Sequence, residues 1–339
     1  MKSIESPIII AHSISPEGVP LITWQLRYWR AIHAELMTHR VFSRNAGSSR
    51  ARPSATIIDS VSKEPWGPLH WGANQKGMQA DQEHAAPVVI PTHLNRSYAE
   101  FLVQIHGEEY SELWDINTFW VSAQEAWHFA AWLNGQLAGS FDTAGYHKQI
   151  VNRITEPYNY IDVVLTSTDF ANWYALRDHK DAQPEIRELA SLMKEVQAHS
   201  TPEVLQPGMW HLPYADSAND IEEAIKFLKI GRITRDIPPA WEINELLKKA
   251  SAARCARVSY KLFDGSNANF EKDLELFNQL LVSQPLHASP AEHQATPDSS
   301  EWVVRDDVEE RVYGHPEQHG NFRGWCQHRK MLPNEFVAG

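Results

Sequence analysis

Cysteine is scarce in this 339-residue chain, in which Cys255 and Cys326 are the two thiols. They are too few for a disulfide framework and too far apart for a metal-type spacing, which fits a reducing cytoplasm. Long apolar runs are also lacking, and the first residues form no charged-then-apolar export signal. We therefore expect a cytoplasmic protein with no membrane partner.

Basic residues are few as well. The chain has 31 Lys and Arg against 43 Asp and Glu, which gives a formal net charge of −12. This balance argues against a general nucleic-acid surface, so no nucleic-acid polymer is expected as a partner. A free nucleotide in a locally basic pocket is compatible with it. A hydrophobic content of 42% and the chain length predict a globular enzyme with a full core.

Thirteen Trp and seventeen His are the unusual part of the composition. Most of the Trp are expected in the core and at interfaces, and some could stack on flat rings. The His residues form no His-x-x-x-His pattern on a convincing helix. A metal hydrolase is therefore disfavoured, and no metal site is expected.

One short segment departs from the acidic background. Residues 35–53 contain four Arg, and no acid lies between Glu35 and Asp59. Arg offers a planar fork of donors that matches phosphate oxygens, while Ser hydroxyls and a Gly-permitted turn add further donors. The segment therefore predicts an anion site, and a solvated basic loop is the alternative. Before it, residues 22–29 alternate like a strand with one buried face, and residues 31–37 can form a short helix.

The order of residues in this segment resembles a known signature. Thr38-His39-Arg40, seven residues and then Ser48-x-Arg50 are similar to the Arg-His-Arg-(seven residues)-Ser-x-Arg signature of the flavin-dependent thymidylate synthases, the ThyX family. The resemblance implies two sets of contacts. The expected FAD contacts are His39, Arg40 and Asn45. The expected deoxynucleotide contacts here are Glu35, Ser48, Ser49 and Arg50.

A second segment resembles another conserved region of the same family. Asn172, four residues and Arg177 precede the Ala-Gln-x-Glu-Ile run at 182–186. The resemblance implies that Arg177 is catalytic and polarises the pyrimidine, that Asn172 contacts FAD and that Arg153 binds the nucleotide. A donor near the ring carbonyl would stabilise the charge that develops there. Without the first motif, an ion pair with Asp181 on one helical face would be the simpler role of Arg177.

A third region resembles the amino-terminal part of ordinary family members. Arg257-Val258-Ser259 and Glu292-His293 are similar to segments that touch FAD there, which implies that Ser259 and His293 bind the cofactor. In those members this region comes first, whereas here it comes last. The chain is therefore interpreted as a long, phage-like and circularly permuted member, in a bacterium or a phage-infected cell. Coincidence is the alternative, because each short match is weak alone.

The resemblance and the hydrophobic pattern together imply an α+β fold, with a mostly antiparallel sheet flanked by helices. We expect one catalytic unit over residues 1–339. It would consist of the nucleotide and flavin motifs at 1–200, a helical insertion at 201–250 and the permuted flavin-binding segment at 251–339. Individual elements are predicted as a strand at 158–168 and helices after Ser122, after Pro184, at 220–228 and at 269–281. The helix after Ser122 starts from a capping-box pattern, Ser122-Ala-Gln-Glu125, and is expected to carry Ala126, Phe129, Ala130, Leu133 and Leu137 on one apolar face. No role is assigned to 54–100 or 300–339.

The function that the resemblance implies is reductive methylation of dUMP to dTMP. The carbon would come from methylenetetrahydrofolate and the electrons from NADPH through FAD, in a homotetramer. The alternative is a flavin-dependent hydroxymethylase acting on dUMP or dCMP, because Thr38, Ala46 and Glu35 stand where typical members have Arg, Glu and Gln. A catalytically inactive nucleotide-binding regulator is a second alternative, against which the retained Arg177 argues.

Overall fold

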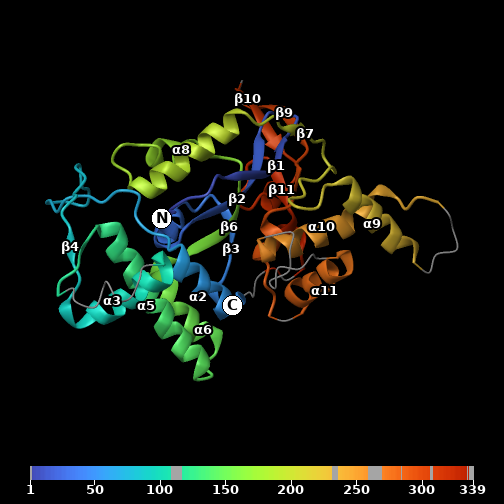
Figure 1. The fold of residues 1–339 in the computed structure, drawn as a ribbon. Helices are drawn as coiled ribbons and strands as arrows, with labels where there is room; N and C mark the ends of the chain where they lie inside the picture. Colours follow the sequence, from blue (N-terminus) through green and yellow to red (C-terminus); the bar gives the residue numbers. More distant parts are fainter. Residues whose placement is uncertain are drawn as a thin grey trace.

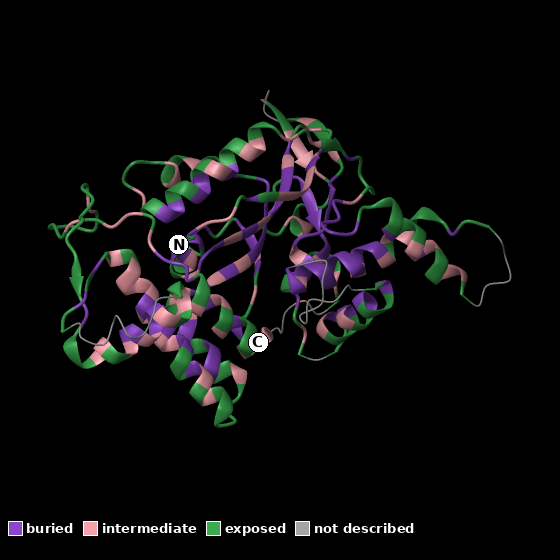
Figure 2. Ribbon diagram, viewed as in Figure 1, coloured by how far each residue is buried: buried purple, intermediate pink, exposed green. Residues whose placement is uncertain are grey.

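The computed structural model describes residues 2–107, 117–230, 236–258, 269–283, 285–305, 308–333 and 335. A central sheet lies between helices on several sides (Figure 1). Figure 2 shows that buried residues gather in the strands of this sheet and on the inward sides of the helices. The predicted α+β fold is therefore confirmed. None of the helices in the described ranges is long and apolar enough to cross a membrane.

Five strands form the central sheet in the order β3-β6-β2-β1-β7. Their bounds are β1 (Ile8–Ile14), β2 (Pro20–Trp29), β3 (Ser43–Ala46), β6 (Tyr160–Ser167) and β7 (Glu203–Val204). Neighbouring strands are antiparallel except for β1 and β7, which pair in parallel. The sheet is thus mostly antiparallel, as expected, and β6 lies inside the predicted strand at 158–168.

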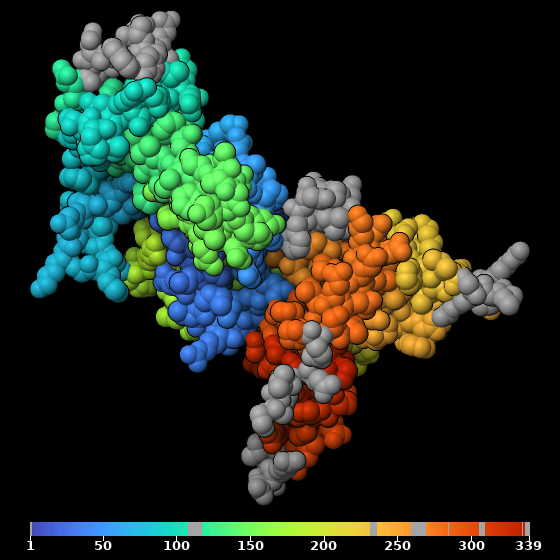
Figure 3. All heavy atoms as spheres, turned by 90° about the horizontal axis from the view of Figure 1, so that it is seen from below, coloured from blue at the N-terminus to red at the C-terminus, as the bar shows by residue number. Residues whose placement is uncertain are grey.

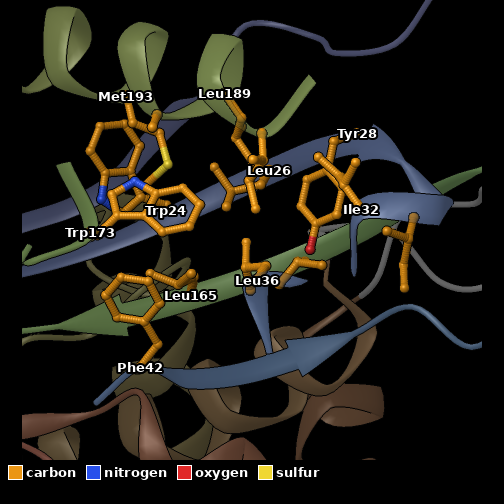
Figure 4. Packing of buried hydrophobic residues seen from close by; sticks show 14 of the residues in the cluster. Trp24, Leu26, Tyr28, Ile32, Leu36, Phe42, Leu165, Trp173, Leu189 and Met193 are labelled. Carbon is orange, nitrogen blue, oxygen red and sulfur yellow. The ribbon is translucent and has the colours of Figure 1, made fainter. Parts of the chain in front are cut away.

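The middle strand β2 carries the main core. Its alternating residues Ile22, Trp24, Leu26 and Tyr28 are completely buried, which confirms the period-two prediction. Helix α8 (Pro184–Ala198) covers this face, and Figure 4 shows its Leu189 and Met193 facing Trp24 and Leu26. Pro184 occupies the first turn of α8, where its missing N–H costs no hydrogen bond.

Two groups of helices lie at opposite ends of the molecule, with the blue residues of the sheet between them (Figure 3). One group consists of α2 (Ser54–Lys63), α3 (Asn95–Phe101), α5 (Ala123–Thr143) and α6 (Lys148–Val151), with the short strands β4 (Val88–Val89) and β5 (Trp120–Val121). The other consists of α9 (Ala218–Lys229), α10 (Ala240–Arg257) and α11 (Phe270–Leu281). The predictions at 220–228 and 269–281 correspond to α9 and α11. Helix α10 spans residue 250, the expected limit between the helical insertion and the permuted segment of the single unit.

The helix after Ser122 differs from its prediction in two ways. Ser122 caps α5 by accepting from the Glu125 backbone N–H at 3.1 Å, but the Glu125 side chain binds the Tyr98 hydroxyl instead of closing a capping box. The buried face also differs, because Leu137, expected inside, is exposed and Trp132 is buried. Trp132 packs into a second core around Tyr98, so a tertiary contact decides which face is covered.

A buried charge network joins α9, α10 and α11. Asp273 has no exposed surface and accepts hydrogen bonds from Arg254, at 2.8 Å, and from Arg257. Arg254 also binds Asp220 of α9 at 2.7 Å. Removing one partner from such a network leaves a buried charge uncompensated.

Replacing Asp273 by Asn is therefore expected to lower the free energy of unfolding by about 3–5 kcal/mol. Urea denaturation followed by circular dichroism measures this change. Asp59→Asn is the matched control, because Asp59 pairs with Lys63 in the exposed part of α2, and it should change the free energy by less than about 1 kcal/mol. A loss in Asp273→Asn no larger than in the control would contradict a stabilising role for the network.

Candidate functional site

Arg177, the predicted catalytic residue, lies at the end of α7 (Ala171–Arg177) against the first motif. Its Nε donates to His39 Nε2 at 2.9 Å, and its Nη2 donates to Thr38 Oγ1 at 3.2 Å. Its Nη1 forms an ion pair with the Glu35 carboxylate. The partner of Arg177 is therefore Glu35 and not Asp181, which the helical spacing offered as the alternative. The carboxyl end of a helix favours a cation at this position. The fold thus brings together two motifs that are 138 residues apart.

His39 is held as a neutral imidazole at this junction. Its ring stacks on Phe42 with the centroids 5.6 Å apart and meets the edge of Trp173 at 4.9 Å. Burial lowers the pKa of His39 first, and the charges of Arg177 and Arg44 lower it further. Because Nε2 accepts from Arg177, the ring proton belongs on Nδ1. A neutral ring can therefore orient Arg177 without repelling it.

The part of the first motif that is predicted to bind an anion, residues 48–52, forms a second cluster with residues 152–158. Ser48 caps the short 3-10 turn η2 (Ser49–Ala51) by accepting from the Arg50 backbone N–H at 3.3 Å. Asn152 Nδ2 donates to the Ser49 carbonyl at 2.7 Å, which holds η2 against η5 (Asn152–Tyr158). Arg50 and Arg153 are both exposed on these adjoining turns. Their two guanidinium groups are available to an anion in solution.

Ser49, a predicted deoxynucleotide contact, also makes a hydrogen bond within the chain. Its hydroxyl donates to Glu156 Oε1 at 2.8 Å, and Glu156 also pairs with Arg30 at 3.3 Å. The side chain therefore helps to hold η2 in place. Sequence reasoning missed Asn152 and Glu156 in this arrangement, because their contacts cross more than 100 positions of chain and follow no local pattern.

Strand β3 connects the Arg177 cluster to the Arg50 cluster. Its four residues span roughly 13 Å of extended chain. Asn45 lies in β3 opposite Val164 and is almost buried, whereas Arg40 and Asn172 are exposed near the Arg177 end. The predicted ligand residues thus follow one edge of the sheet, which suits an elongated ligand or two adjacent ligands.

A cleft of about 1090 Å³ opens beside the Arg177 cluster. Glu35 and Asp178 lie on its wall, together with parts of 68–81 and 180–191. The segment at 54–100, which had no assigned role, therefore supplies one side of a cavity. Its volume is slightly above the range of about 300–1,000 Å³ that is typical of small-molecule sites.

His293 has no exposed surface and lies inside the sheet layer. Its Nδ1 hydrogen-bonds Thr166 Oγ1 at 2.8 Å, and Thr166 bonds Thr23 at 2.7 Å. Thr23 bonds His211 Nε2, whose Nδ1 bonds Ser13, each at 2.8 Å. Burial lowers the pKa of both histidines to about 3. The structure thus gives His293 a core position, and its assignment to the cofactor stays a prediction that requires this side chain to become accessible.

The remaining part of the third region meets the first motif through Gln327. Gln327 Nε2 donates to the Ser43 hydroxyl of β3 at 3.2 Å and to the Glu292 carbonyl at 2.9 Å. Ser259 lies outside the described residues. Just before it, Val258 has a left-handed φ of 57°, which is strained for a β-branched residue. Such strain is typical of functional segments, and it falls inside the Arg-Val-Ser match.

Comparison with models of known protein families found no match for this chain, and none of the curated proteins matches it. The functional argument therefore depends on the residues and on their contacts in the structure.

Proposed function

We propose that this protein is a flavin-dependent thymidylate synthase that methylates dUMP with methylenetetrahydrofolate and reduced FAD. The observation that carries the proposal is the contact of Arg177 with Glu35, Thr38 and His39. The resemblance assigned Arg177 and Glu35 to the substrate and His39 to the cofactor, from two separate motifs. Their meeting in one cluster beside a cleft supports a shared site.

The hydrogen bonds that Arg177 makes within the chain leave N–H donors for the pyrimidine. A guanidinium has five N–H donors, of which the contacts to Glu35, Thr38 and His39 use three. Two N–H groups would then serve a pyrimidine carbonyl, where negative charge develops as the C5 carbon becomes nucleophilic. Glu35 and His39 hold the guanidinium in orientation before the substrate arrives. Preorganised donors of this kind need no rearrangement during the reaction.

The Arg50 cluster would hold the nucleotide phosphate. Arg50 and Arg153 lie exposed on adjoining turns, and Arg side chains bind phosphate oxygens two at a time. Ser48 adds a hydroxyl at the same turn. The base would then extend along β3 toward Arg177.

The residues along β3 also fit an anionic cofactor with several rings. His39, Arg40 and Asn45, the contacts that the resemblance implies, would hold FAD together with Asn172, because they combine a cation and amides near one edge of the sheet. When bound, FAD supplies the hydride that converts the transferred carbon to a methyl group. His39 would stay neutral beside it, since burial and Arg177 both lower its pKa.

The permuted order and the homotetramer belong to the same proposal. The turn η6 (Ser289–Glu292) contacts β3 through Gln327, so a segment that is late in the sequence adjoins the first motif. Ligand residues Arg40, Arg50, Arg153 and Asn172 are exposed in the single chain. A second subunit that covers them would complete the site.

One observation favours the hydroxymethylase as a second candidate. Thr38 replaces an Arg of the family signature, and its hydroxyl both accepts from Arg177 and donates to the Glu35 carbonyl at 2.7 Å. Ala46 replaces a Glu and is exposed. Relative to the family pattern the site therefore lacks one cation, and its carboxylate lies at Glu35 instead of at position 46, so a different group could complete the transferred carbon.

The identity of the product tests both candidates. The enzyme is incubated with FAD, NADPH, methylenetetrahydrofolate and either dUMP or dCMP, and product mass and NADPH consumption are measured together. A synthase yields a methylated product and consumes about one NADPH per product. A hydroxymethylase yields a product heavier by one oxygen, with only priming amounts of NADPH. Binding of FAD and dUMP without any carbon transfer would contradict both and favour the inactive regulator.

A further inference from the structure

Three segments of the carboxyl-terminal region converge on a buried carboxylate. Asp298 directly follows β8 (Ala295–Pro297), His315 begins the turn before η7 (Pro316–Gln318), and Cys326 lies in β11 (Trp325–Gln327). One ligand atom from each of these side chains lies within 4.8 Å of the other two. Asp298 and Cys326 are buried, whereas the His315 side chain is 56% exposed and provides a path from solvent.

We propose that Asp298, His315 and Cys326 bind one divalent transition-metal ion, best matched by zinc, and that His319 positions the carboxylate. This site is independent of the flavin and nucleotide residues, so it does not depend on the proposed function. It also departs from the expectation of no metal site. His315 and His319 do have the four-residue spacing of a metal-binding pair, but they flank one short 3-10 turn rather than a helix.

The surroundings orient the carboxylate for such a role. The Gly324 backbone N–H donates to His319 Nδ1 at 3.3 Å, so the ring proton of neutral His319 is on Nε2. That nitrogen donates to Asp298 Oδ2 at 2.9 Å, and the His315 backbone N–H donates to the same oxygen at 2.8 Å. The other oxygen, Oδ1, faces His315 Nδ1 at 3.0 Å. Hydrogen bonds to one carboxylate oxygen that leave the other for the ion are usual around metal sites.

Gly324 allows the backbone to form the turn that brings His319 to Asp298. Its φ of 72° is left-handed, and its carbonyl accepts from the Asp298 backbone N–H at 3.0 Å. A Cβ at this position would lie 2.7 Å from the Tyr313 hydroxyl. The turn that brings His319 to Asp298 therefore requires glycine for two separate reasons.

The ligand chemistry selects the metal. A thiolate, an imidazole and a carboxylate are ligands of zinc, whereas magnesium and calcium prefer oxygen alone. Zinc bonds of 2.0–2.3 Å place tetrahedral ligand atoms about 3.3–3.6 Å apart. Asp298 Oδ1 and His315 Nδ1 are 3.0 Å apart, and the ligand atoms of all three residues lie within 4.8 Å of one another. These distances bracket the range expected for zinc. Small side-chain rotations would reach it, with a fourth position for water or another small ligand.

A structural hydrogen-bond hub is the competing explanation, and Cys326 separates the two. The hub accounts for the His315 and His319 contacts of Asp298. In the metal-free protein the Cys326 thiol is also hydrogen-bonded to Asp298, so the two explanations differ in whether the thiol keeps its proton or binds a metal as the thiolate. A metal ion would displace the thiol proton and neutralise both groups.

The ion would fasten the carboxyl-terminal segment next to β3. Asn321 and Gln327, on the same segment as the ligands, both hydrogen-bond Ser43 at the start of β3, at 3.4 and 3.2 Å. The Trp325 indole donates to the Val19 carbonyl at 3.2 Å, beside the turn between β1 and β2. Metal loss is therefore expected to loosen this segment, which lies close to β1 in Figure 1.

The test measures metal content and spectrum rather than activity. The full chain is treated with a chelator, reloaded with Zn²⁺ or Co²⁺ and desalted, and bound metal is quantified by mass spectrometry. The expected result is about one ion per chain, with a thiolate-to-cobalt charge-transfer band for the Co²⁺ form. Cys326→Ser should abolish that band and lower the affinity for zinc by at least about tenfold.

The second cysteine provides a matched control. Cys255 is equally buried but lies in α10, so Cys255→Ser should keep the metal and the charge-transfer band. His315→Ala is the second variant, because its half-exposed ring can be removed without opening the core, and it should also lower zinc affinity. Folding of each variant is checked by circular dichroism. The proposal is overturned if the parent holds no stoichiometric zinc after reloading, or if folded Cys326→Ser and His315→Ala bind zinc as the parent does.

Discussion

Arg177→Ala is expected to lower product formation by about 10²–10³-fold while FAD remains bound. The substitution removes the donors that would stabilise charge on the pyrimidine, and it leaves the cofactor residues of β3 in place. Steady-state turnover with dUMP gives kcat, and the flavin absorbance per chain gives FAD occupancy. Both measurements are needed, because loss of FAD would also abolish turnover.

The chain offers controls for charge and for folding. Arg96→Ala removes a cation from an exposed pair with Glu100 on α3 and should leave kcat unchanged. Arg177→Lys keeps the charge but not the planar fork, so it should recover only part of the activity. Near-normal turnover in Arg177→Ala would exclude this residue from catalysis. A fall in kcat together with loss of folded structure would assign it a structural role instead.

The sequence predicted best those features that depend on local pattern. The alternation in 22–29 predicted the buried face of β2, since side chains of a strand alternate strictly between its two faces. The Pro at 184 predicted where α8 begins. The predicted buried face of α5 was wrong, because Trp132 and Leu137 are both apolar and only packing against residues such as Phe101 and Phe129 decides which is covered.

The candidate site was predictable only in part. Spacing singled out Arg177 and His39 separately, but their hydrogen bond depends on how α7 packs against the loop after α1 (His33–Leu36). Gln327 was missed, because a single Gln carries no signal until the fold brings it to Ser43. The burial of His293 was equally hidden, since a His beside a Glu is as common on a ligand surface as in a core.

Acid is expected to destabilise the protein steeply below pH 6.5, because several buried histidines are neutral in the folded state. Burial lowers the pKa of His211, His293 and His328 from 6.5 to about 3, and the charges of Lys248 and Lys249 add to the effect at His328. Unfolding exposes these rings to water and returns their pKa to about 6.5. The unfolded chain therefore binds protons that the folded chain excludes, and stability present above pH 6.5 is lost as the pH falls toward 3.

The expected size of this effect is large. Each of the three histidines contributes about 1.4 kcal/mol per pH unit below 6.5, so together they lower the free energy of unfolding by about 4 kcal/mol per unit. A domain stable by 5–15 kcal/mol would thus lose much of its stability by about pH 5. Urea denaturation at pH 7.5, 6.5 and 5.5 measures the slope directly.

Replacing His293 by Gln should reduce the slope by about one third, because one of the three titrating groups is removed while an amide can still bond Thr166. The exposed His93 is the matched control, since its ring is in water in both states, and His93→Gln should keep the slope of the parent. Equal slopes in all three proteins would mean that His293 is already charged or already hydrated in the folded state. That outcome would also reopen the cofactor assignment of His293, because a hydrated ring would be within reach of a ligand.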